Sequence, residues 1–169
     1  MNRIIVAFAF ILHTSLLAAD ECVFNQEDQP RIIDAIAKMY PGGKIDHEKR
    51  QVRWSDPVDG ITTFVYGGCQ HLGSEVSQGS PLPKARTQEQ IFTLARKLSQ
   101  RFWINAVVPS SRIATEALER ALKQSEYTVI KVEGRTVFSI QEQVYTQLFI
   151  EHEYNDGVDR VSISWVGNF

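Results

Sequence analysis

Two His-Glu pairs, His47-Glu48 and His152-Glu153, are the first residues in this chain that suggest metal chemistry. Both match the start of the zinc-protease motif H-E-x-x-H, in which two histidines one helical turn apart reach one metal ion. The fifth position is Gln51 in one case and Asp156 in the other, and both stretches are typical of strands or turns. We therefore predict no metal site and no cofactor. Neither a G-x-S-x-G nucleophile elbow nor a phosphate-cradling glycine loop occurs, so no catalytic residue is assigned.

The most unusual local stretch covers residues 66–73, with the sequence YGGCQHLG. Its paired glycines allow positive φ or a close approach of another segment, which favours a bulge that brings Cys69 to Cys22. The alternative is a site that uses His71, together with Glu75. The three histidines after residue 20, which are His47, His71 and His152, could also converge in space, and the sequence leaves this open.

Cys22 and Cys69 are the two cysteines of the chain. Two thiols in a small exported domain are typically bridged, so we predict a disulfide between them. The bridge would close a loop of about 48 residues, which the chain-entropy model credits with roughly 4 kcal/mol.

The first residues are typical of a secretory signal peptide. Arg3 gives a positive start, residues 4–12 are an unbroken apolar run, and Ala18-Ala19 offers a cleavage site. We expect residues 1–19 to be removed and residues 20–169 to form a single secreted domain in the periplasm. This export signal is too short to serve as a membrane anchor, and no stable anchor is expected after cleavage.

Composition narrows the range of partners. Loss of Arg3 leaves 17 Lys and Arg against 20 Asp and Glu, a net charge of −3. Nucleic acid is therefore not an expected partner, because its phosphates require clustered cations. The sequence does not indicate an oligomeric state.

Three amphipathic helices are predicted. The first follows Gln29-Pro30 and ends at Pro41, and the second starts at Thr87, where Gln90 completes a capping box. The third begins near Ser110 or Ser111. Residues at helical spacing are expected to face the core: Ile33, Ile36, Ala37 and Tyr40 in the first helix, Ile91, Leu94, Ala95, Leu98 and Phe102 in the second, and Ile113, Ala114, Ala117, Leu118, Ala121 and Leu122 in the third.

Strand patterns occupy the stretches between and after the helices. Alternation or β-branched composition predicts strands at 52–54, 61–66, 72–77, 127–132, 136–140, 144–154 and 158–166. The order predicts an α+β fold in which antiparallel β-meanders pack against the three helices, tied by the disulfide. The helix-then-meander plan occurs twice, so the domain is either one unit or two such halves joined near residues 78–83.

Charge and glycine content suggest a binding surface. Residues 84–123 carry eight cations and three acids, a net of +5, and this region holds the second and third helices. A pair of helices with an excess of positive charge can steer an acidic protein partner. The predicted surface combines two groups of residues: Tyr66, Gly67, Gly68 and His71 from the glycine-rich stretch, and Arg96, Arg101 and Arg112 from the helices.

These observations favour a non-enzymatic periplasmic protein that binds a protein partner. We expect an inhibitor- or immunity-type protein that neutralises an envelope-directed enzyme or toxin. Two alternatives remain open. One is a small periplasmic hydrolase that uses residues around His71, and the other is a ligand-binding accessory module of the envelope.

Overall fold

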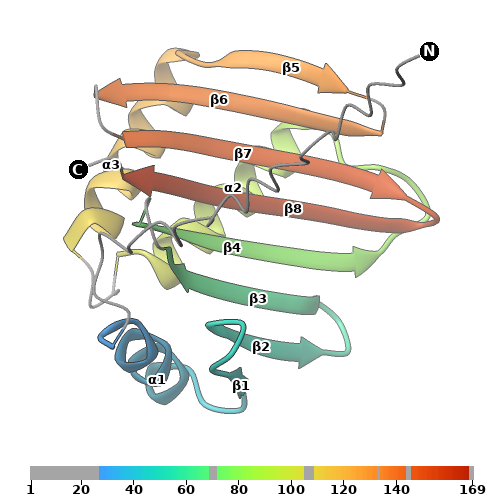
Figure 1. Cartoon of the computed structure of the whole chain (residues 1–169). Coiled ribbons are helices and arrows are strands. Elements are labelled where there is room, and N and C mark those ends of the chain that lie inside the picture. The colour runs from blue at the N-terminus through green and yellow to red at the C-terminus, as the bar shows by residue number, and fades with distance from the viewer. Residues whose placement is uncertain (1–26, 69–71, 105–108, 133, 144–145, 168–169) are drawn as a thin grey trace, which may run out of the picture.

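The computed structural model describes residues 27–68, 72–104, 109–132, 134–143 and 146–167 (Figure 1). These residues form one eight-stranded antiparallel sheet and three helices, which confirms the predicted α+β class. The cysteines, Cys22 and Cys69, and His71 lie outside the described residues. None of the described helices is long and apolar enough to cross a membrane.

The helices start where their sequence signals predict. Helix α1 (Gln29–Met39) has Pro30 in its first turn, and helix α2 (Gln88–Phe102) is preceded by a capping box between Thr87 and Gln90. Helix α3 spans Pro109–Gln124. The apolar stripe of α2 is fully buried as predicted. In α3, Ile113 is 60% exposed, so its predicted core position is wrong.

The strands are ordered β1-β2-β3-β4-β8-β7-β6-β5 across the sheet. Their bounds are β1 Lys44–Asp46, β2 Gln51–Asp56, β3 Gly60–Gly67, β4 Leu72–Pro81, β5 Thr128–Val132, β6 Arg135–Gln143, β7 Thr146–Asn155 and β8 Val158–Gly167. Every neighbouring pair is antiparallel. Strand β1 was not predicted. It is three residues long and carries Lys44 and Asp46, so it lacks the apolar alternation that marks a strand.

Two meanders meet at the centre of the sheet. The first half runs through α1 and β1 to β4, the second runs through α2, α3 and β5 to β8, and β4 pairs with β8 over its whole length. Residues 78–81 belong to β4 rather than to a linker, so the connection to α2 is the shorter stretch that begins at Leu82. One continuous set of strand pairings therefore spans both meanders.

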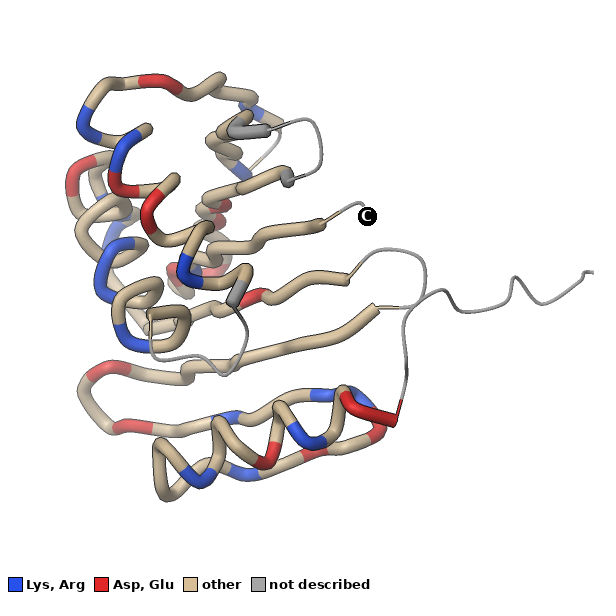
Figure 2. Tube along the Cα trace, turned by 90° about the vertical axis from the view of Figure 1, so that its left-hand side faces the viewer, with Lys and Arg blue, Asp and Glu red and all other residues tan. Residues whose placement is uncertain are grey.

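The helices cover one face of the sheet, as Figures 1 and 2 show. The registers place one buried apolar residue from each of six neighbouring strands in a single row across that face. In the order β2, β3, β4, β8, β7 and β6, these residues are Val52, Phe64, Val76, Ile163, Ile150 and Phe138. Buried side chains of all three helices belong to the same core, including Ile33, Phe102 and Leu118. Burial of this row against the helices stabilises the fold, at about 25 cal/mol per Å² of apolar surface.

Alternate strand residues point to the opposite face, which no described helix covers. The same registers place Thr63, Ser77, Ser162 and Glu151 in a row there. Two ion pairs also lie on this face, Arg160 with Glu75 at 3.2 Å and Arg135 with Glu151 at 3.5 Å. The mixed polar composition fits a sheet with one buried face and one wet face.

Candidate functional site

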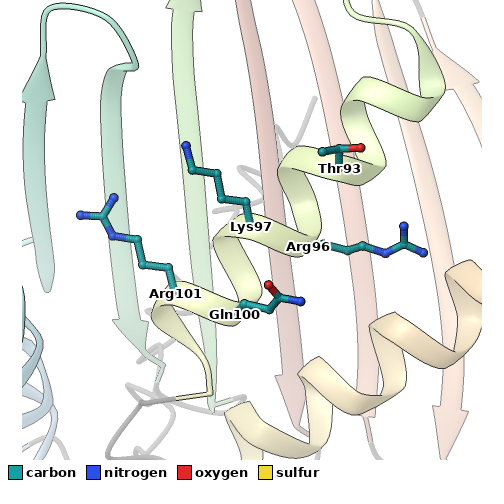
Figure 3. A pocket seen from close by; sticks show the side chains of 5 residues that line it. All are labelled: Thr93, Arg96, Lys97, Gln100 and Arg101. Carbon is teal, nitrogen blue, oxygen red and sulfur yellow. The ribbon is translucent and has the colours of Figure 1, made fainter.

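Helix α2 carries two of the three predicted arginines on its outer side (Figure 3). Arg96 and Arg101 line a groove of about 600 Å³ together with Thr93, Lys97 and Gln100. The side chains of Leu94, Leu98 and Phe102 occupy the buried stripe of the same helix, which leaves the cations on the solvent side. The 3.6-residue period of the helix therefore concentrates three positive charges along less than two turns.

Glu119 of α3 contacts two residues of this groove. Arg96 Nε lies 3.1 Å from one carboxylate oxygen of Glu119, and Gln100 Nε2 donates a hydrogen bond of 3.0 Å to the other. On the other side, Lys97 Nζ lies 3.5 Å from Asp59 in the β2–β3 turn. These pairs are partly or mostly exposed, and such pairs contribute little to stability because water screens them. Their main effect here is to orient Arg96 and Lys97.

Arg101 has a different environment. Its guanidinium carbon lies 5.3 Å from the ring centre of Tyr40 and 5.1 Å from that of Phe102. The Tyr40 hydroxyl donates a hydrogen bond to the Arg101 carbonyl. No ion pair of Arg101 occurs among the described residues. A guanidinium stacked in this way keeps planar N–H donors for a carboxylate, and its stacking restrains its orientation.

A second groove extends this surface along α2. It encloses about 500 Å³, shares Thr93 and Lys97 with the first groove, and reaches back to Arg86 before the helix. Asp59 and Gln78 line its far side, where Gln78 Nε2 donates a 2.7 Å hydrogen bond to the Asp59 carbonyl. We call Arg96, Lys97 and Arg101 the α2 cation cluster. Its chemistry suits acidic groups of a ligand or a partner protein.

The other predicted site residues do not join this cluster. Arg112 lies near the start of α3, where its Nε is 3.1 Å from Glu116 of the same helix. Tyr66 is buried in the core, and this burial raises the pKa of its hydroxyl. The structure thus brings Arg96 and Arg101 to one groove on α2, and it places Tyr66 in the core.

The paired glycines meet the start of α1 instead. Gln29 Nε2 donates a 2.8 Å hydrogen bond to the Gly68 carbonyl, and the Gly68 N–H donates to Gln29 Oε1 at 3.2 Å. Arg50 also donates to Gln29 Oε1, at 2.6 Å. Gly67 has φ +138°, and a Cβ there would lie 2.2 Å from Gln29 Oε1. Gly67 therefore allows the close approach that the glycine-rich sequence suggested.

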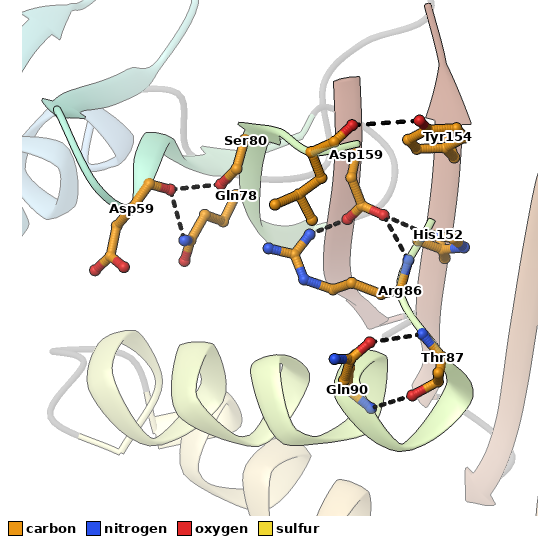
Figure 4. A network of polar contacts seen from close by, with 10 residues as sticks. Asp59, Gln78, Ser80, Arg86, Thr87, Gln90, His152, Tyr154 and Asp159 are labelled. Carbon is orange, nitrogen blue, oxygen red and sulfur yellow. Dashed lines mark hydrogen bonds and ion pairs between the residues drawn. The ribbon is translucent and has the colours of Figure 1, made fainter. Parts of the chain in front are cut away.

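Sequence reasoning missed a buried polar cluster at the other end of the sheet (Figure 4). Asp159 of β8 is 0% exposed and lies 2.9 Å from His152 Nε2. It also accepts a 3.0 Å hydrogen bond from the Arg86 backbone N–H and forms an ion pair with the Arg86 guanidinium. Burial, and secondly the Arg86 cation, lower the pKa of His152. Burial lowers the pKa of Arg86 as well.

This cluster fixes the connection between the two meanders. Leu82 donates its N–H to the Gly157 carbonyl at 2.9 Å, and its own carbonyl accepts from the Tyr154 hydroxyl at 3.2 Å. Arg86 ties the end of the same connection to Asp159. The His152 ring contacts Asp159 within this cluster, and through Asp159 it is linked to Arg86 at the entrance to α2.

The histidines described by the structure do not converge. His47 lies 3.4 Å from Asp34 of α1, at the β1 edge of the first meander, whereas His152 is buried in β7 of the second. Within the described ranges, no group of three or more His, Cys, Asp and Glu residues could hold a metal ion. The α2 cation cluster therefore remains the strongest candidate surface.

Comparison with protein-family models, with curated proteins and with solved structures gives no match for this chain.

Proposed function

We propose that this protein is a non-enzymatic, exported binding protein of the inhibitor or immunity type, which acts in the periplasm on an envelope-directed enzyme or toxin. The α2 cation cluster is the proposed contact for acidic groups of that partner. The observation that carries the proposal is that Arg96, Lys97 and Arg101 line one exposed groove, in which Lys97 and Arg101 extend to the same side of α2 and Arg96 extends toward Glu119 of α3.

The geometry supports a role in association more than in tight anchoring. Lys97 is held by an exposed ion pair and Arg101 is stacked on aromatic rings, so both heads are presented at the surface, whereas Arg96 is partly exposed and its Nε atom is buried against Glu119. Rim charges of this kind accelerate the encounter between two proteins and make it salt-dependent, whereas buried anchors control dissociation.

A disulfide between Cys22 and Cys69 is part of the proposal. Gly68, which immediately precedes Cys69, is hydrogen-bonded to Gln29 at the start of α1. Cys22 is seven residues before Gln29 in the sequence, a separation that an extended chain spans at about 3.5 Å per residue. The bridge would therefore join two segments that already meet next to it. Mass spectrometry of the non-reduced mature protein tests this bridge, and two free thiols would end the idea.

The function is tested by capture from periplasmic extract with the mature protein, residues 20–169, as bait. The expected result is one protein partner, retained at physiological salt and identified by mass spectrometry. If no partner is captured, the binding-protein function is wrong, and a hydrolase or a ligand-binding module becomes the better hypothesis.

The surface is tested with the captured partner by binding kinetics over a salt series. Replacement of Arg96, Lys97 and Arg101 with Ala should slow association about tenfold at low salt and flatten its salt dependence. The matched control replaces Lys38, Lys44 and Arg53, three exposed cations of the first meander, with Ala. Arg112→Ala is measured separately because Arg112 pairs within α3. Equal effects of the two triple variants would place the contact elsewhere on the protein without removing the binding function.

A further inference from the structure

The two edges of the sheet differ in length and in chemistry. Strand β5 forms one edge of the sheet, and among the described strands its single neighbour is β6 (Figure 1). All five of its residues are exposed, including Val129 at 43%, Ile130 at 49% and Val132 at 62%. An edge strand leaves alternate backbone N–H and C=O groups without a ladder partner, and those groups can pair with another strand.

The opposite edge strand is shorter and more highly charged than β5. Strand β1 has three residues, and charged Lys44 and Asp46 flank its one apolar residue, Ile45. Short length and charge are features by which natural sheets discourage edge-to-edge pairing. Strand β5 has the sequence TVIKV, with four β-branched residues, one charge and no proline. This composition is typical of a strand that is paired on both sides.

The register with β6 shows which side chains of β5 share a face. Ile130 is opposite Val137, which lies on the uncovered face of the sheet, and Val132 is on that face as well. Val129 is opposite the buried Phe138 and is therefore on the helix side, as is Lys131. The edge thus presents Ile130 and Val132 beside Val137, an apolar strip on the uncovered face.

We propose that β5 pairs antiparallel with β5 of a second copy of this chain, about a two-fold axis at Ile130. The strand is self-complementary in that arrangement. Ile130 of each copy faces its counterpart, Val132 faces Thr128, and Lys131 faces Val129. The single charge of the strand never meets its own copy, so no like-charge repulsion opposes the pairing. The ladder of the eight-stranded sheet continues into the second copy, and the two apolar strips lie side by side on the same face of the joined sheet.

A two-fold arrangement is also the simplest closed assembly. Antiparallel pairing of one strand with itself is isologous and stops at two copies, whereas β5 against β1 would be head-to-tail and would build rings or open filaments. The charged ends of β1 disfavour that second mode. The structure therefore assigns the β5 edge to a dimer interface, and this assignment does not depend on the proposed function.

Sedimentation velocity of the mature protein over a concentration series tests the dimer. We expect the mass to rise from that of one chain to that of two. Ile130→Lys should keep the protein monomeric over the same series, because two lysines would face each other at the axis. Ile45→Lys is the matched control, since Ile45 is exposed to a similar extent, at 43%, on the other edge strand. A native protein that stays monomeric, or a dimer unaffected by Ile130→Lys, overturns the proposal. Species larger than two copies overturn the two-fold arrangement.

A second measurement locates the axis and does not depend on whether the lysine variant folds. Ile130→Cys places two thiols directly opposite each other, within the distance that a disulfide requires. Val129→Cys places them diagonally, too far apart for a bridge. Under mild oxidation, peptide mapping should find chains joined through position 130 and not through position 129. Equal yields at both positions, or none at 130, contradict the proposed register.

Discussion

Asp159 of β8 contacts His152 of β7 diagonally across the two strands, with a carboxylate oxygen 2.9 Å from the His152 Nε2 atom in a part of the protein closed to solvent. A buried carboxylate is tolerated only when its charge is compensated. The Arg86 guanidinium and backbone N–H supply that compensation from the connection between the two meanders. The contact thereby holds the segment that leads into α2 against β7 and β8 of the second meander.

Asp159→Asn should destabilise the protein strongly, because it leaves the largely buried Arg86 without its anion. Loss of one partner of a buried ion pair costs about 3–5 kcal/mol. Chemical denaturation of the variant and the wild type measures this difference. Asp156→Asn, in the exposed turn of the same hairpin, is the control, since Asn tolerates the positive φ of 51° found there. A loss at Asp159 no larger than that at Asp156 would show that the cluster does not stabilise the fold.

The lowered pKa of His152 gives the stability a defined pH dependence. The folded state keeps His152 neutral to lower pH than the unfolded state, where the ordinary value is about 6.5. Between these two values the unfolded chain binds more protons, so acidification below about pH 6.5 favours unfolding. The slope contributed by one such group is at most about 1.4 kcal/mol per pH unit.

Urea denaturation at pH 7.5, 6.5 and 5.5 would follow this effect. These values are about one pH unit apart around the ordinary histidine pKa. We expect stability to fall with pH in the wild type and in His47→Gln, and to fall less in His152→Gln. The exposed His47 serves as the control because it pairs with Asp34 at the surface. A profile that His152→Gln leaves unchanged would assign the pH dependence to other groups.

The sequence predicts the helices well because their signals are local. The capping box of Thr87 and Gln90 and the apolar stripe of α2 each depend on residues within a few turns of one another. Strand order has no such signal. The central pairing of β4 with β8 joins segments more than seventy residues apart, and nothing in either strand specifies the other. Strand β1 could not be predicted for the same reason, because it is ordered by its pairing with β2 rather than by its own residues.

In the candidate site, too, some features follow from the local sequence and others depend on long-range packing. The excess of cations in residues 84–123 was sufficient to predict a basic surface on the helices, but the burial of Tyr66 depends on packing across the sheet. Asp159 could have been suspected, since it lies two residues before Val161 and shares the inward side of β8. The buried Asp159 carboxylate is tolerated because it pairs with Arg86, which is 73 residues away in the sequence.

The proposed export predicts which residue is the first of the mature protein. When the full sequence is expressed in a Gram-negative host, the protein recovered from the periplasm should begin at Asp20, because Ala19 is the last small residue before two acids. Amino-terminal sequencing of that fraction identifies the first residue. Recovery of a chain that still carries Met1 would contradict cleavage, and Ala19→Asp should reduce processing if the site is correct.

Gly67 should be among the least replaceable residues of the first meander. Its φ of +138° is strained for any residue with a Cβ, and an alanine Cβ would lie 2.2 Å from Gln29 Oε1. Gly67→Ala must therefore displace the Gln29 side chain, whose amide bonds Gly68 and Arg50, and we expect a loss of about 2–3 kcal/mol. Gly79→Ala is the matched control: it lies in β4, and a Cβ there would have no atom within 4 Å. Its expected effect is within about 0.5 kcal/mol. Equal urea midpoints for the two variants would mean that Gln29 and the β3 end separate at little cost, and that their contact does not hold α1 against the sheet.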